Sequence, residues 1–125
     1  MFKIFNRASE IVLDGLTIAN THAENANIAS DDSKGSVIYM QDSVVTVRNC
    51  TITKNCAHGV PGILDESGST IILEKCVFEG NVNGRHGVLR IGDQSKFLVE
   101  SCVFADNTTT NSPSGYGWAG AIFIS

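Results

Sequence analysis

The sequence lacks a basic cluster, a long apolar run and a helical hydrophobic pattern. Its 125 residues include 9 Lys or Arg and 13 Asp or Glu, which gives a formal net charge of −4 at pH 7. Without a positive patch, binding to nucleic acid or to an anionic membrane is disfavoured. No stretch is apolar for long enough to cross a membrane, so we expect no membrane insertion by this segment. Residues 1–7 also lack the apolar run of a signal peptide.

What the sequence has instead is an internal repeat with a step of 26 residues. Three residue types recur at this step: cysteine, serine and asparagine. They are Cys50, Cys76 and Cys102; Ser43, Ser69 and Ser95; and Asn55, Asn81 and Asn107. A fixed period of this length indicates a solenoid, in which each copy of the repeat stacks on the copy before it.

Each copy contains three short apolar arms with the periodicity of a strand. In one copy the first arm is the pair Ile71 and Leu73, and the second is the pair Cys76 and Phe78. The third arm follows a glycine or a serine, as at residues 87–89. An earlier, looser copy precedes these, offset by 34 residues from its counterpart: Ile11, Leu13, Leu16 and Ile18.

This pattern predicts an all-β chain folded as a right-handed parallel β-helix. We expect about four to five rungs of ~26 residues, with three short strands in each rung. Each strand would hydrogen-bond to its equivalent in the next rung, roughly 4.8 Å away, and parallel crossovers are almost always right-handed. The alternative is an antiparallel sandwich, which needs regular hairpin turns and does not require identical residues at a fixed step.

The C-x-F-x-x-N runs at residues 76–81 and 102–107 resemble the F-x-x-N repeats of the chlamydial polymorphic outer-membrane proteins, within the pectin-lyase-like superfamily. Gly120-Ala121-Ile122 is similar to that family's G-G-A-I element, with Ala119 in place of the first glycine. The run at residues 50–55 departs from the pattern, because it has Ile52 where phenylalanine is typical. The resemblance spans residues 44–125 and implies a β-helix repeat of a secreted or cell-surface protein, acting as an adhesin or a scaffold.

We expect residues 1–9 to form an N-terminal cover, with Phe2 and Ile4 over the first rung. Residues 10–125 would then form a single β-helix domain. Residues 122–125 stop inside a third arm without a polar cap, so we expect a fragment of a longer coil with an open end.

Two excursions interrupt the repeat, at residues 22–35 and 108–119. Both leave the coil just after the corner that holds Asn20 in one copy and Asn107 in another. Insertions on one side of a solenoid often mark its functional side, so we expect these loops to bind a glycan or a host-cell surface protein. The candidate binding residues are Asp31, Asp32, Tyr116 and Trp118. The other interpretation is that corners simply tolerate insertions.

Two repeated columns are predicted to have structural roles. The asparagine column would stack its amides as a hydrogen-bonded ladder at a corner, and the cysteine column would face inward as small apolar side chains. Stacking places adjacent cysteine Cα atoms roughly 5 Å apart, within the range of a disulfide, although parallel side chains suit that bond poorly. The disulfide state therefore stays open for Cys50, Cys56, Cys76 and Cys102.

No catalytic residue is predicted. The polygalacturonase pattern of paired aspartates, G-H-G and R-x-K is incomplete, because Gly92 replaces the lysine after Arg90. No cofactor is expected apart from calcium, for which Asp65, Glu66 and Asp93 offer the carboxylate oxygens that this ion prefers. The same acidic group could equally be a solvated corner. If the chain belongs to an enzyme, we expect a carbohydrate-active lyase or hydrolase.

One outward column of the predicted coil is apolar, namely Val12, Thr46, Ile72 and Leu98. A stripe of this kind often marks an interface, so side association through it and end-to-end association through the open coil end are both expected modes. The leading hypothesis is a non-catalytic structural or adhesive module that presents corner loops for binding. The alternative is a fragment of a pectate-lyase-like or polygalacturonase-like enzyme.

Overall fold

The computed structural model describes residues 2–22, 37–57, 62–65, 67–84, 86–109 and 121–124. All regular secondary structure in these ranges is β-strand. The strands are β1 (Phe2–Asp14), β2 (Thr17–Ala19), β3 (Ile38–Arg48), β4 (Thr51–Thr53), β5 (Cys56–Ala57), β6 (Ile63–Asp65), β7 (Thr70–Glu74), β8 (Val77–Glu79), β9 (Val82–Asn83), β10 (Leu89–Ile91), β11 (Lys96–Glu100), β12 (Val103–Ala105), β13 (Thr108–Thr109) and β14 (Ile122–Ile124).

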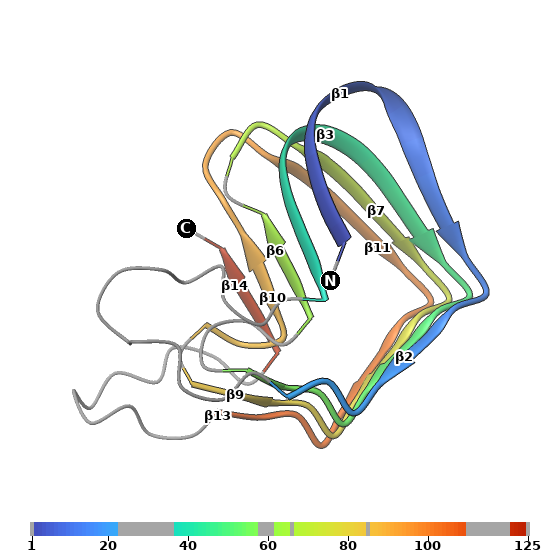
Figure 1. Cartoon of the computed structure of the whole chain (residues 1–125), viewed down its shortest axis with the longest axis vertical. Coiled ribbons are helices and arrows are strands. Elements are labelled where there is room, and N and C mark those ends of the chain that lie inside the picture. The colour runs from blue at the N-terminus through green and yellow to red at the C-terminus, as the bar shows by residue number, and fades with distance from the viewer. Residues whose placement is uncertain are drawn as a thin grey trace.

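These strands form three sheets, and every pairing between the described strands is parallel. The largest sheet has the order β11-β7-β3-β6-β10-β14, with β1 also paired to β3. The second sheet has the order β12-β8-β4-β2 and the third β13-β9-β5. Figure 1 shows equivalent strands lying one behind another, with the chain passing between sheets at corners. The predicted all-β parallel fold is therefore confirmed, and the antiparallel sandwich is wrong.

The strand register follows the 26-residue repeat. Ile71 pairs with Val45 on one side and with Phe97 on the other, and Phe78 pairs with Ile52 and Phe104 in the same way. Stacking of residues 26 apart is thus confirmed for these strands. Between β1 and β3 the offset is 34 from Ile11 onward, as the sequence predicts, and 36 up to Arg7, with the change of register lying between Arg7 and Ile11.

The first and third arms of each copy belong to one sheet. The alternation of apolar residues in the sequence did not predict this. β3 runs without interruption from a third arm into the next first arm and turns at Asp42, whose φ is 47°. β1 likewise joins a third-arm segment to a first-arm segment, and it turns at Asn6, whose φ is 48°. Residues 2–5, predicted to be a cover, lie inside β1 and pair with residues 38–41, with Ile4 buried and Phe2 and Phe5 exposed.

Each corner uses a residue in the left-handed conformation. Because stacked copies turn at the same place, these residues form three columns with φ between 47° and 68°. The columns are Gly15, Asn49, Lys75 and Ser101; Asn20, Lys54, Gly80 and Asp106; and Asn6, Asp42, Gly68 and Gln94. A glycine occupies each column once, and the other positions hold residues for which this conformation is costly or uncommon.

The core lies between the three sheets and consists of inward columns of aliphatic side chains. Phe78 is fully buried, and its ring stacks on Phe104 with centroids 4.9 Å apart and planes inclined by 5°. The partly buried members of the core belong to the first and the last strands. They are Ile11, Leu13, Leu16, Ile18, Phe97, Val99, Cys102, Phe104 and Ile122.

Candidate functional site

The asparagine column forms a directional chain of hydrogen bonds at one corner. The backbone N–H and the Nδ2 of Asn55 both donate to Oδ1 of Asn81, at 3.0 and 3.1 Å. Asn81 donates to Oδ1 of Asn107 in the same two ways, at 3.0 and 2.9 Å. Asn55 and Asn81 are fully buried, so these amides are occupied by bonds that hold the corner together.

The first position of this column is Thr21, where the sequence-based assignment to Asn20 was wrong. Thr21 donates its backbone N–H and its Oγ1 to Oδ1 of Asn55, at 3.0 and 2.9 Å. Asn20 occupies the preceding left-handed position, equivalent to Lys54, with φ 58°. Ile18 pairs with Ile52, which lies 34 residues later, and the same offset makes Thr21 the equivalent of Asn55. Thr21 could therefore have been predicted from the sequence.

The cysteine column lies at another corner and points to backbone carbonyls. Cys76 Sγ lies 3.3 Å from Val47 O and 3.4 Å from Glu74 O, and Cys102 Sγ accepts the Cys76 backbone N–H at 3.3 Å. Burial raises the pKa of the Cys76 thiol from 9.0 to about 11. All four cysteines are free thiols here. A thiol held protonated in this way is a poor nucleophile and a poor metal ligand.

Asp65 points into the core. Its side chain is fully buried, and its register partner in β3 is Met40, which is also fully buried. Oδ2 accepts the backbone N–H of Gly92 at 3.1 Å, whereas Oδ1 has no hydrogen-bond partner among the described residues. Asp93 is exposed and its backbone bridges to Ser67, so the two aspartates face different surroundings.

The other predicted site residues fall mostly outside the description. Glu66, Asp31, Asp32, Tyr116 and Trp118 lie outside the described residues, as does His58. Their predicted roles in calcium binding and in loop recognition remain predictions. Among the residues that the structure does describe, no group of three His, Cys, Asp or Glu side chains is arranged to hold a metal ion.

His86 lies just before the third arm of its copy of the repeat. His86 is partly buried, and the next residue, Gly87, donates its backbone N–H to Asn83 Oδ1 at 3.2 Å. Asn83 is itself fully buried and donates Nδ2 to Thr108 O at 3.1 Å. Asn83 could not be predicted from the repeat, because its equivalents, Ala57 and Thr109, are different residue types.

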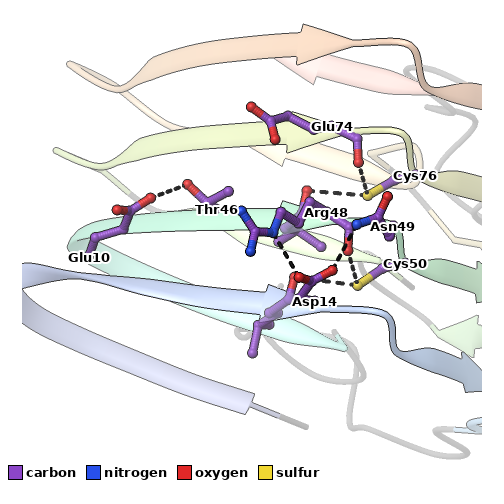
Figure 2. A network of polar contacts seen from close by, with 10 residues as sticks. Glu10, Asp14, Thr46, Arg48, Asn49, Cys50, Glu74 and Cys76 are labelled. Carbon is purple, nitrogen blue, oxygen red and sulfur yellow. Dashed lines mark hydrogen bonds and ion pairs between the residues drawn. The ribbon is translucent and has the colours of Figure 1, made fainter.

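The outer face of the largest sheet carries an aliphatic stripe. Val12, Thr46, Ile72 and Leu98 are register partners on β1, β3, β7 and β11. Val12 is 45% exposed and Leu98 is 54% exposed. Thr46 is buried, and its Oγ1 donates to Glu10 Oε1 at 2.5 Å, as Figure 2 shows.

A charged column runs beside this outer stripe, two residues further along each strand. It consists of Asp14, Arg48, Glu74 and Glu100. In Figure 2, Arg48 Nε and Asn49 Nδ2 reach Asp14, at 2.9 and 2.8 Å. The hydrogen bond from Asn49, followed by that from Arg48, lowers the pKa of Asp14 below its ordinary value of 3.8.

The other end of the charged column is acidic and hollowed. A surface pocket of about 200 Å³ is lined by Glu74, Lys75, Glu100 and Ser101. Glu74 and Glu100 are register partners at this end, Arg48 is paired with Asp14, and Lys75 is the one cationic side chain among the residues that line the pocket, so the lining carries two acidic groups against one basic group. The outer stripe and this pocket together offer an aliphatic surface with a place for a cationic group at its edge.

Comparison with known proteins gives one family match. Residues 36–125 match a family model described as "right handed beta helix region". No curated protein and no solved structure gives a significant match to the chain. None of the described residues belongs to a helix long and apolar enough to span a membrane.

Proposed function

The chain belongs to the right-handed β-helix family, and we propose that it is a non-catalytic scaffold that adheres to a protein on a cell surface. The scaffold is a continuous coil of about four to five turns. The parallel registers from β1 to β11, from β2 to β12 and from β5 to β13 support this proposal. A secreted or cell-surface location is what the resemblance to the chlamydial polymorphic outer-membrane proteins implies.

The outer stripe is the observation that carries the proposal. Three of its four side chains, Val12, Ile72 and Leu98, are aliphatic, and water leaves such a surface readily when a partner covers it, whereas Thr46 is buried and bonded to Glu10. Its members Val12 and Leu98 are about half exposed although they lie on well-paired strands. Folding of the sheet does not require this exposure, because polar residues could occupy the same outward positions.

The partner that this surface fits is a protein with aliphatic residues and a lysine or an arginine beside them. The aliphatic residues would cover the outer stripe, and the cation would enter the pocket between Glu74 and Glu100. The outer stripe itself contains no aromatic side chain, which makes a sugar ring the poorer ligand for it. The corner loops predicted at residues 22–35 and 108–119 would add contacts beyond the stripe.

Polysaccharide cleavage is the alternative, and Asp65 is the observation in its favour. A buried carboxyl with one oxygen unpartnered among the described residues is unusual for a purely structural side chain. Together with Glu66 and Asp93 it would supply oxygen ligands for calcium, as pectate-lyase-like chemistry needs. Asp65 is fully buried whereas Asp93 is exposed, which makes this arrangement less favourable than the scaffold.

The test is attachment of the labelled chain to cultured cells, compared between two matched variants. Leu98→Glu places a charge in the outer stripe, whereas Val103→Glu places it at an equally exposed aliphatic position, 52% exposed, on β12 of another sheet. We expect Leu98→Glu to lower attachment at least about tenfold, the effect of losing roughly 1.4 kcal/mol, and Val103→Glu to leave it unchanged. Protease treatment of the cells should abolish attachment, and periodate treatment should not.

Two results would overturn the scaffold. Equal attachment by both variants would remove the outer stripe as the adhesive surface. Release of reducing ends from polygalacturonate by the purified chain would establish the enzyme instead, especially if calcium raised the melting temperature of the chain and Asp65→Asn abolished that rise.

A further inference from the structure

Asn83 is a buried side chain that ties one turn of the coil to the next. Its Oδ1 accepts the backbone N–H of Gly87 at 3.2 Å, and its Nδ2 donates to Thr108 O at 3.1 Å. The residue is fully buried at the end of β9, where it pairs with Ala57 on one side and with Thr109 on the other. Neither partner is an asparagine, so a repeated amide ladder does not account for it.

The residue that follows Asn83 is glycine, and no other asparagine in the sequence precedes a glycine. In an Asn-Gly pair the backbone nitrogen of the glycine can attack Cγ of the asparagine. The new N–Cγ bond closes a five-membered succinimide as the Cγ–Nδ2 bond breaks, and Nδ2 leaves as ammonia with the proton that the attacking nitrogen loses. Water then opens the ring and leaves aspartate or isoaspartate. Glycine permits this attack best, because it has no Cβ in the way.

We propose that Asn83-Gly84 is a hydrolytic modification site that the folded coil holds closed and that local opening of β13 exposes. Water is the only co-reactant. The site would limit the lifetime of the scaffold, because a chain that opens there is altered permanently. This inference goes beyond the proposed adhesion, since it concerns the third sheet and not the outer stripe.

The fold opposes the reaction in three ways. Both hydrogen bonds of the Asn83 side chain must break before Cγ can turn toward the nitrogen of Gly84. Ring closure also requires ψ of Asn83 to leave the extended range, which its pairing with β5 and β13 fixes. Asn83 and Gly84 are both buried, so the water that opens the ring is kept away.

The restraint on the β13 side is the weaker one. β13 consists of two residues, of which Thr108 is exposed and Thr109 is partly buried. Among the described strands it pairs with β9 alone, whereas Ala57 on the β5 side is buried. Short and exposed elements open at a smaller free energy than the centre of a fold. Opening of β13 therefore releases Nδ2 of Asn83 and admits water while the rest of the coil stays folded.

Modification would convert this tie into a repulsive contact. An aspartate at position 83 has no donor for Thr108 O and places a negative charge against that carbonyl in a buried position. An isoaspartate also adds a carbon to the backbone, which disturbs the register of β9 with both neighbours. Since the ammonia is lost, closing of the coil does not reverse the change.

The first experiment compares the folded chain with the chain in guanidinium chloride, both at mildly alkaline pH. Peptide mapping by mass spectrometry locates the exchange of an amide for an acid. We expect modification at Asn83 to be at least about a hundredfold slower in the folded chain, because the open population is small in the native state. Gly84→Ala should slow the reaction in denaturant, where folding has no influence.

Two matched variants separate opening of β13 from unfolding of the whole coil. Asn107→Ala removes the Oδ1 that holds the corner leading into β13. Ile4→Val lowers the stability of the coil by a similar amount from β1, in another sheet. In native buffer we expect Asn107→Ala to speed modification of Asn83 about fivefold and Ile4→Val to leave its rate unchanged. Urea midpoints of the two variants establish that their stabilities are matched.

Asn83→Asp tests the consequence directly. We expect its urea midpoint to lie below that of the unaltered chain at neutral pH, and the gap to shrink as the pH falls. A protonated carboxyl can again donate to Thr108 O, whereas the charged form is disfavoured in the folded state, so stability is lost as the pH rises. Asn83→Ala removes both hydrogen bonds without adding a charge, and its gap should not depend on pH.

Three results would overturn the proposal. Equal rates in the folded and the denatured chain would show that the fold does not hold the site closed. Equal acceleration by Asn107→Ala and Ile4→Val would assign the reaction to unfolding of the whole coil. A gap for Asn83→Asp that does not change with pH would remove the repulsion at Thr108. None of these results bears on attachment through Leu98, so the scaffold function stands or falls separately.

Discussion

Cys76 illustrates how single side chains are used in this molecule. It lies between Cys50 and Cys102 in its column, is 1% exposed and contacts two backbone carbonyls. Its environment favours the neutral thiol, so the side chain behaves as a small apolar group with a weak donor. The same holds for Asn81, whose side-chain amide accepts a hydrogen bond from Asn55 and donates one to Asn107 in the neighbouring copies of the repeat.

The raised pKa of Cys76 has a consequence for stability at high pH. The folded thiol ionises at about 11, whereas the unfolded thiol ionises near its ordinary value of 9.0. Below pH 9 both states are protonated and stability is unaffected. As the pH rises from about 9 to about 11, the unfolded chain loses this proton first, so the fold is progressively destabilised.

We therefore expect the urea midpoint of the unaltered chain to fall more steeply above pH 9 than that of Cys76→Ala. The variant starts from a lower stability, because it leaves a small cavity, and the comparison is one of slopes. Cys102→Ala, at a partly buried position of the same column, is the matched control and should keep the steep slope. Parallel slopes for the unaltered chain and Cys76→Ala would contradict the assignment.

Residue identity was only partly predictable from the sequence. The asparagine and cysteine columns repeat at a fixed step, so the sequence shows directly which of these residues stack on one another. Asp65 does not repeat, and its acidic character suggested a solvated corner. Its equivalent one step later is Ile91, which is 2% exposed. The register with Ile91 therefore predicted a buried side chain at residue 65, whereas its acidic character suggested, wrongly, an exposed one.

At the scale of elements, the corners determine how the strands stack. Each corner column contains one glycine and several residues that adopt positive φ at a cost. The second corner offers a matched pair, since Lys54 has φ 54° and its neighbour in the next copy, Gly80, has φ 62°. A Cβ at Gly80 would approach nothing closer than 3.8 Å, so backbone conformation alone decides the outcome there.

We expect Lys54→Gly to raise the free energy of unfolding by about 0.5–1 kcal/mol and Gly80→Ala to lower it by about 1 kcal/mol. Relief of the left-handed strain at residue 54 outweighs the extra freedom that glycine has in the unfolded chain. Urea titration of the two variants measures both changes. Loss of stability in Lys54→Gly would show that the lysine side chain contributes more than its backbone costs.

Element boundaries were less predictable than element registers. The apolar pairs located the strand centres of β7, β8, β11 and β12 because their alternation is strict. β1 and β3 are long because a third arm and a first arm join through a corner, and they pair on both sides of it despite the register shift between Arg7 and Ile11. Nothing in the alternation of apolar residues distinguishes such a bend from a break. The merged sheet could therefore not be foreseen.

At the scale of the whole molecule, position along the coil axis sets the energetic weight of a repeated residue. Asn81 and Asn107 have the same chemistry and accept the same two donors from the copy below. Asn81 lies in the middle and is fully buried, whereas Asn107 lies in the last turn and is partly exposed. Water can replace the lost bonds at the end of the coil but not in its middle.

We expect Asn81→Ala to cost about 3 kcal/mol or more, because it leaves the backbone N–H of Asn55 and one N–H of its side-chain amide without an acceptor and away from water. Asn107→Ala should cost only about 1 kcal/mol in the isolated chain, since solvent reaches the donors of Asn81. Urea unfolding of the two variants measures both costs. Equal costs would mean that Asn107 is shielded as well as Asn81 is.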